Sequence, residues 1–208
     1  MNMREAYNMW SEQYDTNINR TRDLEAIALR KTLSAIPVKR CLEIGCGTGK
    51  NTEWLVNRCK EMTCVDLSEE MLQKAKQKIS SEKACFYQAD ITFPWTFVEH
   101  SYDLVSFSLV LEHIEDLDHI FNEAANTMQS GGYLYIGELH PFKQYSGTKA
   151  RFDTEAGQYT LNCFTHPVSE FVQTAKKYGL ILTDLNEYFD NNNRSEIPRI
   201  LTLLFRLD

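Results

Sequence analysis

The stretch that decides the fold is Arg40-Cys41-Leu42-Glu43-Ile44-Gly45-Cys46-Gly47-Thr48-Gly49-Lys50-Asn51-Thr52. The apolar run at its start predicts a buried strand, and a helix can begin at about Asn51. Three glycines at alternate positions lie between them, and they allow the backbone to turn sharply and to approach a ligand closely. The start of a helix adds free N–H groups. A tight glycine-rich turn of this kind is where α/β folds bind nucleotide-like cofactors.

The spacing of the glycines excludes two common nucleotide-binding loops. A dinucleotide fingerprint has the form Gly-x-Gly-x-x-Gly, but counting from Gly45 the sixth position is Lys50, and Gly49 comes one residue too early. A Walker A loop requires Gly-Lys-Ser/Thr, and here Asn51 follows Lys50. The remaining pattern, Glu-x-Gly-x-Gly-x-Gly, resembles motif I of the class I S-adenosylmethionine-dependent methyltransferases.

That resemblance implies S-adenosyl-L-methionine as the cofactor and S-adenosyl-L-homocysteine as its product. In the family, the strand-end acid and the glycine turn hold the amino-acid and ribose portions of the cofactor. The matching residues are Glu43, Gly45, Cys46, Gly47 and Gly49. Glu43 also has a structural interpretation, in which its carboxylate bonds to nearby backbone N–H groups at the end of the strand.

An acid follows the second predicted strand, which covers Met62–Val65. Asp66 stands about twenty residues beyond the first glycine, where an acid binds ribose hydroxyls. A surface aspartate in a turn is the alternative. Ser68 can cap a helix from Glu69 to Ile79. The resemblance extends the cofactor site to Leu67 and to Met71 on that helix.

Two further strands end at residues that match the family. After the strand Ala84–Gln88, the resemblance assigns Asp90 to the adenine amino group and Ile91 to the face of the ring. The strand Tyr102–Phe107 leads into a segment similar to the family's Leu-x-His-Ile/Val sequence, which runs beside the methionine end of the cofactor. Ser108 and Leu109 are therefore expected to face the site.

Three residues are candidates for a general base, which is needed only if the acceptor must lose a proton. They are His113, Glu138 and His140, and all lie at the carboxyl edge of the predicted sheet, where open α/β folds bind ligands. His113 is either a structural histidine at a helix start or a neighbour of the acceptor. His140 could equally orient a lid. A catalytic metal is not implied.

The N-terminal segment predicts a helix, because Met3, Tyr7, Trp10 and Tyr14 follow one helical face. Met3 and Tyr7 are interpreted as packing residues. Trp10 to Asp15 resembles the Trp-x-x-x-Tyr-Asp segment that small methyltransferases lay over the cofactor, so Tyr14 is a candidate to line the site. A second helix is predicted from Thr21, as N-cap, to Ala35, with Leu24, Ile27 and Ala28 facing inward.

The alternation of strands and helices predicts one doubly wound α/β sheet. Further helices are expected from Asn51 to Cys59, from Asp116 to a Ser130-Gly131-Gly132 end, and from Ser169 to Tyr178. The chain closes with an antiparallel pair at 180–188 and 197–206. The resemblance implies a Rossmann-like methyltransferase fold of seven strands in the order 3-2-1-4-5-7-6, with strand 7 antiparallel.

The chain is therefore expected to form a single domain, 1–208. Its helices at 1–37 and an irregular insertion at about 140–166 would form a cap on the acceptor side, because a long irregular connection in a compact domain is usually functional. The six cysteines show no Cys-x-x-Cys pair and are interpreted as reduced, buried thiols.

Composition limits the partners. A net charge of −7 over 208 residues argues against a nucleic-acid binder, which needs a basic face. No apolar run approaches the ~20 residues that cross a bilayer, so we expect no membrane partner and a cytoplasmic protein.

The sequence therefore predicts an S-adenosylmethionine-dependent methyltransferase that acts on a small molecule, with oxygen or nitrogen favoured over carbon or sulfur as the acceptor atom. One alternative is a macromolecular acceptor; the acidic balance and the absence of an Asn/Asp-Pro-Pro-Tyr/Phe motif argue against nucleic acid. The other is a non-catalytic cofactor-binding or regulatory protein. The acceptor, the oligomeric state and the pathway stay open.

Overall fold

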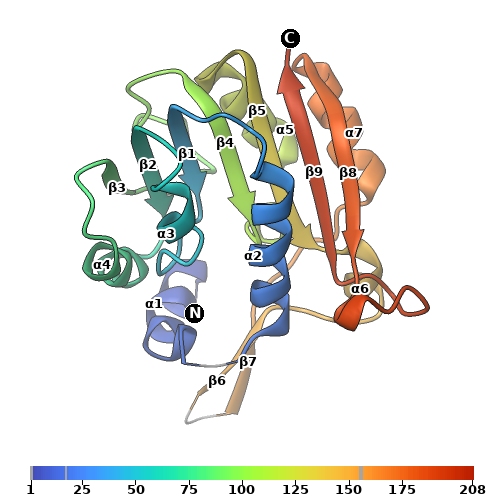
Figure 1. Ribbon diagram of the computed structural model, residues 1–208. Coiled ribbons are helices and arrows are strands. Elements are labelled where there is room, and N and C mark those ends of the chain that lie inside the picture. Colours follow the sequence, from blue (N-terminus) through green and yellow to red (C-terminus); the bar gives the residue numbers. More distant parts are fainter. Residues whose placement is uncertain (1, 17, 155–156) are drawn as a thin grey trace.

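The computed structural model describes residues 2–16, 18–154 and 157–208, and a seven-stranded sheet forms its centre (Figure 1). The strand order is β3-β2-β1-β4-β5-β9-β8. β9 runs antiparallel to both of its neighbours. The predicted order 3-2-1-4-5-7-6 is thus confirmed, with β8 and β9 as the sixth and seventh strands. The strands are β1 (Arg40–Ile44), β2 (Glu61–Asp66), β3 (Ala84–Gln88), β4 (Tyr102–Ser108), β5 (Met128–Leu139), β8 (Leu180–Tyr188) and β9 (Ile200–Leu207).

Helices cover both faces of the sheet because successive strand residues point to opposite sides. In β1, Cys41 packs with Leu29 in a cluster that joins the sheet to α2 (Arg20–Leu33), α3 (Thr52–Leu55) and α4 (Glu69–Lys78). Leu42 packs with Phe121 in the cluster on the other face, beneath α5 (Leu117–Thr127) and α7 (Val168–Lys177). The apolar run Cys41–Ile44 of β1 is therefore part of a strand that is buried on both faces.

A third group of elements lies at the edge where the parallel strands end. It consists of α1 (Met3–Tyr14), α6 (Pro141–Tyr145) and the hairpin of β6 (Arg151–Thr154) with β7 (Gly157–Thr160) (Figure 1). Ala6, Trp10 and Leu161 form a small cluster that joins α1 to the chain after the hairpin. The predicted insertion at 140–166 thus contains α6 and this hairpin; its residues 155 and 156 lie outside the described part.

Hydrogen bonds fasten α1 to the edge of the sheet. Asp15, just after the helix, accepts a hydrogen bond from the Thr48 hydroxyl in the glycine turn (2.6 Å) and pairs with Lys78 of α4 (2.8 Å). Ser68, at the end of β2, donates to the Asn8 side chain (2.6 Å). The N-terminal helix is therefore held against the strand ends that carry the sequence motifs.

Several predictions about the first half of the chain are wrong in detail, as the helix caps and the burial of individual side chains show. α2 begins at Arg20, because the Asn19 side chain accepts hydrogen bonds from the backbone of Thr21 and Arg22 and is the N-cap. Ile27 is exposed rather than inward, and Ala26, Ala28 and Leu29 face the sheet. The helix predicted from residue 51 to 59 is a single turn, α3.

Other corrections concern the second half. α5 ends at Thr127, and Met128 already pairs with Tyr102, so Gly131 and Gly132 lie in β5 instead of ending a helix. α7 begins after Pro167, which places Ser169 inside the first turn. The last strand starts at residue 200. Cys85 is exposed because β3 is an edge strand, whereas Cys41, Cys46, Cys59 and Cys64 are buried.

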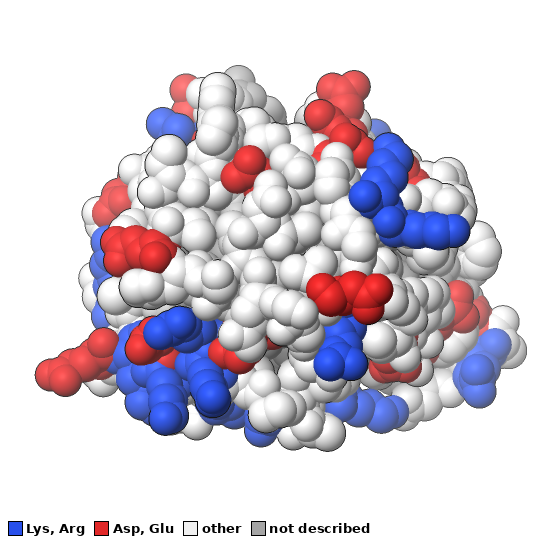
Figure 2. Space-filling view, turned by 90° about the horizontal axis from the view of Figure 1, so that it is seen from above, with Lys and Arg blue, Asp and Glu red and all other residues white. Residues whose placement is uncertain are grey.

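The opposite edge of the sheet has a mixed charge. Seen from the side where the parallel strands begin, Lys and Arg gather in one group at the lower left and elsewhere are interspersed with Asp and Glu (Figure 2).

None of the described helices has both the length and the apolar character that a bilayer crossing requires.

Candidate functional site

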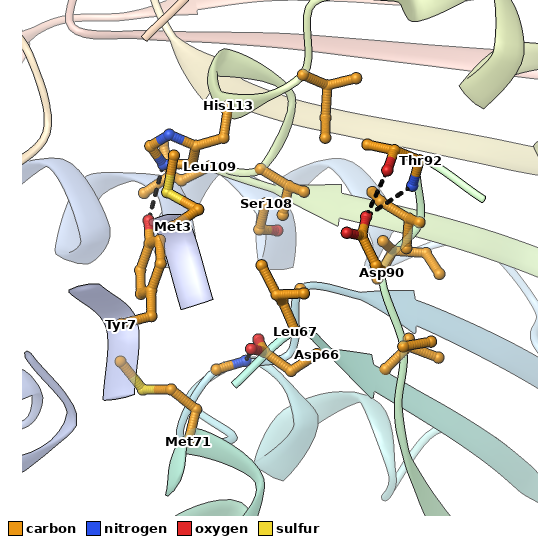
Figure 3. A pocket seen from close by; sticks show the side chains of 18 of the residues that line it. Met3, Tyr7, Asp66, Leu67, Met71, Asp90, Thr92, Ser108, Leu109 and His113 are labelled. Atoms are coloured by element: carbon orange, nitrogen blue, oxygen red, sulfur yellow. Dashed lines mark hydrogen bonds between the residues drawn. The ribbon is translucent and has the colours of Figure 1, made fainter. Parts of the chain in front are cut away.

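A cavity of about 200 Å³, here called the inner cavity, opens where β1, β2 and β4 end (Figure 3). It collects most of the residues that the sequence assigned to the cofactor, although these come from segments far apart in the chain. The predicted residues that line it are Tyr14, Gly45, Gly47, Asp66, Leu67, Met71, Asp90, Ile91, Ser108, Leu109 and His113.

The glycine turn forms one wall of the inner cavity. Gly45 and Gly47 have positive φ (+70° and +53°), which side chains rarely adopt. A Cβ on Gly45 would come within 2.2 Å of Val110 Cγ2. Glycine is therefore needed here so that the segment after β1 can lie close to the segment after β4. A Cβ on Gly47 would meet only Tyr14, at 3.9 Å. Gly47 therefore leaves open space over its backbone, as a ligand cradle requires.

Gly49 does not line the cavity. Its α-carbon faces α4, where an added Cβ would lie 3.4 Å from Ala75 and from Ile79. The third glycine of the motif thus allows the turn to pack closely on a helix.

Asp66 ties the glycine turn to the end of β2. Its Oδ2 accepts a hydrogen bond from the backbone N–H of Gly47 (2.8 Å), and its Oδ1 accepts one from that of Ser68 (2.9 Å). Burial raises the pKa of this carboxyl above its ordinary value, although these backbone donors act in the opposite direction. Each carboxylate oxygen can accept a second hydrogen bond, so Asp66 can receive two hydroxyl groups from a ligand in the cavity.

Asp90 lies across the cavity from Tyr7 and His113 (Figure 3). Its Oδ1 accepts hydrogen bonds from both the backbone N–H (3.0 Å) and the hydroxyl (2.6 Å) of Thr92. Thr92 therefore fixes the orientation of the carboxylate, and Oδ2 is directed to other donors. Ile91 beside it is buried and supplies an apolar surface.

Glu43 and Cys46 lie behind the glycine turn, in a small recess that also reaches Tyr14, Gly45 and Ser108. Glu43 accepts a hydrogen bond from the Thr52 hydroxyl (2.6 Å), and burial raises its pKa to about 8. Cys46 is also buried in this recess. Both residues adjoin the inner cavity without lining it.

Glu25 of α2 enters the same recess, and the sequence reasoning missed it. Its carboxylate accepts hydrogen bonds from Asn51 (2.8 Å), from Ser108 (2.8 Å) and from Tyr135 (3.1 Å). Burial raises its pKa, and these donors lower it. The sequence did contain a signal, because Glu25 stands between Arg22 and Ala26 on the buried face of the helix. A buried carboxylate requires hydrogen-bond partners, so its position indicates a polar cluster.

His113 forms a hydrogen-bonded pair with Tyr7. The Tyr7 hydroxyl lies 2.7 Å from His113 Nε2, and His113 Nδ1 lies 3.2 Å from the carbonyl oxygen of Asn162. A carbonyl can only accept, so Nδ1 carries a proton, and in the neutral form of the ring Nε2 is the acceptor for the Tyr7 proton. Burial, followed by the nearby Tyr14 and Glu112, raises the pKa of Tyr7 well above its ordinary value. Tyr7 is therefore a protonated phenol that donates to His113.

Met3 and Tyr7 were interpreted as packing residues, but both line the inner cavity. The signal in the sequence was their position on the same helical face as Tyr14, which was itself considered for the site.

Glu138 and His140 do not line the inner cavity. Oε1 of Glu138 accepts hydrogen bonds from the backbone N–H groups of Val110 (2.9 Å) and Leu111 (2.8 Å). His140 is fully buried; its Nδ1 accepts from the backbone of Phe142 at the start of α6, and its Nε2 lies 3.0 Å from Glu187. Their positions favour structural roles over the predicted role of base.

Glu138 holds a strained turn in the site. Leu109 has a positive φ (58°), which is unfavourable for a residue with a branched side chain. Its backbone N–H donates to the Gly137 carbonyl (2.8 Å), and Glu138 binds the next two N–H groups. β5 therefore stabilises the conformation that directs Leu109 toward the cavity.

A second cavity of about 290 Å³, here called the outer cavity, lies beside the first. Both are lined by Tyr7, Tyr14 and Leu109, so these side chains form a wall between them. Most of the rest of the outer cavity comes from α1, from the start of α2, and from the chain at 148–151 before and within β6. Glu112, Leu139 and Arg199 complete its lining.

The residues of the inner cavity fit the cofactor that the resemblance implies. Gly47 leaves room for a ligand at the turn, Asp66 offers acceptors to a diol, and Asp90 with Ile91 offers an acceptor beside an apolar surface. Carboxylates also suit a positively charged group. Within the described residues, no three His, Cys, Asp or Glu side chains are grouped as metal ligands.

Comparison with protein families matches residues 42–136 to the family described as "Methyltransferase domain". A Ubiquinone biosynthesis O-methyltransferase of Coxiella burnetii is 28% identical over 170 residues, which cover 77% of this chain and 72% of that protein.

Solved structures share the fold. The N-methyltransferase NodS from Bradyrhizobium japonicum, crystallised with S-adenosyl-L-homocysteine, superposes with a TM-score of 0.73 at 18% identity and covers 100% of this chain and 99% of its own. An S-adenosylmethionine-dependent methyltransferase from Mesorhizobium loti has a TM-score of 0.70 at 18% identity, covering 86% of this chain and 96% of its own.

Proposed function

We propose that this chain, whose residues 42–136 match the methyltransferase domain family, is a class I S-adenosylmethionine-dependent methyltransferase. It binds S-adenosyl-L-methionine in the inner cavity and methylates a small molecule at an oxygen or nitrogen atom. The observation that carries this proposal is the convergence of the glycine turn, Asp66 and Asp90 around one cavity at the carboxyl edge of the sheet. The ubiquinone-pathway O-methyltransferase relative supports a small acceptor. When bound, the cofactor supplies an electrophilic methyl group on a sulfonium.

Each part of the inner cavity has a proposed role in holding the cofactor. Asp66 binds the ribose hydroxyls through its free acceptor positions, and Asp90 with Ile91 binds the adenine. Leu67 and Met71 supply apolar contacts on the α4 side. Gly45, Gly47, Ser108 and Leu109 shape the wall nearest the recess of Glu43, Cys46 and Glu25. Tyr14 covers the site from α1. These contacts fix the donor, and orientation of this kind supplies ~7–11 kcal/mol of a reaction barrier.

We assign the acceptor to the outer cavity, with α1 and the 140–166 segment as its cap. In this assignment Tyr7 takes the proton from the acceptor oxygen or nitrogen while its own proton moves to His113 Nε2, 2.7 Å away. The imidazolium that forms keeps its Nδ1–H bonded to Asn162 and has the Glu112 carboxylate 4.0 Å from Nε2. Of the three predicted bases, His113 is therefore the one we retain.

Titration calorimetry with S-adenosylmethionine, S-adenosylhomocysteine and NAD tests the cofactor. We expect both sulfur compounds to bind at one site and NAD not to bind. A mass-detected methylation assay on small-metabolite pools then tests the acceptor class. Binding of NAD without S-adenosylhomocysteine would contradict the proposal.

A further inference from the structure

We propose that the outer cavity selects an acidic acceptor, a small molecule that carries a carboxylate or a phosphoryl group besides the atom that is methylated. This inference rests on the proposed function, because it assigns the substrate class of the same site. It follows from the positive charge around the outer cavity, from three basic side chains there that form no ion pair within the described part of the chain, and from the position of the aromatic side chains in its lining.

Positive charge is concentrated around the outer cavity although the protein is acidic. Five basic side chains line it: Arg20, Arg22, Lys149, Arg151 and Arg199. Glu112 is the one acidic residue among the described lining residues. The whole chain carries a net charge of −7. A basic cavity in an acidic protein attracts anions locally, and low-dielectric walls strengthen that field.

Two of these cations have neighbours that fix them in place. Arg199 forms a two-pronged ion pair with Asp190, with both N–O distances at 2.6 Å, and reaches the Thr21 hydroxyl (3.1 Å). The Arg22 guanidinium lies 3.9 Å over the Tyr14 ring and donates to the Tyr14 carbonyl. They shape the wall, and Asp190 neutralises the charge of Arg199.

The other three cations are available to a ligand. Arg20, Lys149 and Arg151 are exposed, and none forms an ion pair with any residue that the structure describes. Arg20 begins α2, whereas Lys149 and Arg151 come from the chain that leads into β6. Cations from two separate elements thus converge on one cavity, which is the arrangement that binds an oxyanion by charge-assisted hydrogen bonds.

The aromatic wall gives the acid an orientation. Tyr7 and Tyr14 line both cavities and therefore mark the side of the outer cavity that adjoins the inner one, and Trp10 also lines the outer cavity. An acceptor whose anionic group lies among the three cations directs its opposite end toward the Tyr7 hydroxyl, where the proposed proton transfer occurs. Carboxylate and phosphoryl acceptors both satisfy this geometry, and the experiment separates them.

Binding of matched probes tests the inference without relying on turnover. Benzoate is compared with benzamide, and phenyl phosphate with phenol, by calorimetry on protein saturated with S-adenosylhomocysteine. We expect at least one acid to bind about tenfold more tightly than its neutral partner, and we expect the preference to shrink at high salt. Whichever of benzoate and phenyl phosphate binds more tightly identifies the acceptor class as carboxylate or phosphoryl.

A charge-neutralised variant localises the effect. Lys149→Gln combined with Arg151→Gln should weaken binding of the preferred acid about tenfold and leave its neutral partner unchanged. Arg4→Gln is the matched control, because Arg4 is an exposed cation of α1 that lines neither cavity. Thermal unfolding confirms that the variants fold.

Equal binding of acids and neutral partners would overturn the inference, as would an acid preference that the double variant leaves intact. Failure of S-adenosylhomocysteine to bind would instead overturn the proposed function. In that case the same probe pairs on unloaded protein still decide whether the outer cavity selects anions.

Discussion

Tyr7 is the residue on which the proposed proton transfer depends, because it lines both cavities and its hydroxyl is bonded to His113. Replacement by phenylalanine keeps the ring and removes the relay. Tyr7→Phe should lower kcat about a hundredfold or more and leave the affinity for S-adenosylhomocysteine unchanged. His113→Gln should have a similar effect, because it removes the ring nitrogen that receives the Tyr7 proton.

Tyr145→Phe is the control for that pair, since Tyr145 is exposed on α6 and lines neither cavity. An unchanged kcat in Tyr7→Phe would exclude the relay.

Asp66 offers a separate test of the cofactor site. Asp66→Asn removes the charge that would bind the ribose hydroxyls but keeps an oxygen for the Gly47 N–H. We expect S-adenosylhomocysteine to bind about 10- to 100-fold more weakly by calorimetry. Asp118→Asn, on the far face of the sheet, should bind normally. Equal affinities for the two variants would mean that Asp66 serves only the turn.

Gly45 and Gly47 allow the cost of backbone strain to be distinguished from the cost of a steric clash. Both have positive φ, but only at Gly45 would a Cβ clash with Val110. Gly45→Ala should therefore reduce the free energy of unfolding by about 1–3 kcal/mol more than Gly47→Ala does, because overpacking adds to the backbone strain. Denaturant titration measures the difference, and equal losses would show that the turn relaxes away from Val110.

The residues that the sequence placed correctly are those whose role follows from their order along the chain. Asp66 ends β2 and Asp90 stands two residues beyond β3, so their position at the carboxyl edge was predictable. Glu138 lies near the end of β5 and binds the backbone N–H groups of Val110 and Leu111. His140 follows β5, and its Nε2 lies 3.0 Å from Glu187. These partners depend on which segments lie nearby in space, and such long-range contacts leave no local pattern.

At the scale of elements, the hairpin β6–β7 is separable from the rest of the fold. Its ends meet, because the Leu161 N–H donates to the Ala150 carbonyl (2.9 Å). Residues 151–160 can therefore be replaced by two glycines. We expect turnover to fall about a hundredfold, since the acceptor loses one side of its cavity, while S-adenosylhomocysteine binds normally. Equal losses in both measurements would identify the hairpin as scaffold.

Helices and strands whose apolar residues recur at a regular period were predictable from the sequence, and segments without such a period were not. The alternation of strands and helices predicted a doubly wound sheet, and the order of its seven strands was implied by the family resemblance. The segment at 140–166 shows no such period, so α6 and the hairpin were not foreseen. Ile27 illustrates the same limit inside a helix: burial depends on how α2 lies on β5 and β9, which composition does not reveal.

At the scale of the whole molecule, two buried carboxyls make stability depend on pH. Burial raises the pKa values of Glu43 and Glu138 to about 8 in the folded protein, so the native state holds protons that the unfolded state releases. The free energy of unfolding should therefore fall as pH rises toward 8. Between about pH 6.5 and 8 we expect a loss of about 1–3 kcal/mol.

Chemical denaturation at several pH values measures this loss. The window lies above the ordinary pKa of His140, whose own value burial lowers, so that histidine does not offset the trend. Glu138→Gln should flatten the dependence, because its amide oxygen can still accept from Val110 and Leu111. A wild-type stability that is constant or rises over this range would contradict the prediction.

Tyr7, Tyr14 and Leu109 line both cavities, so in the proposed assignment of cofactor and acceptor this shared wall links the two binding events thermodynamically. A ligand that orders these side chains from one side removes a conformational cost for the ligand on the other side. Linkage is reciprocal, so the factor by which the cofactor product changes acceptor affinity equals the factor by which the acceptor changes product affinity. The wall that separates the two compartments is thus also the element that couples their occupancy.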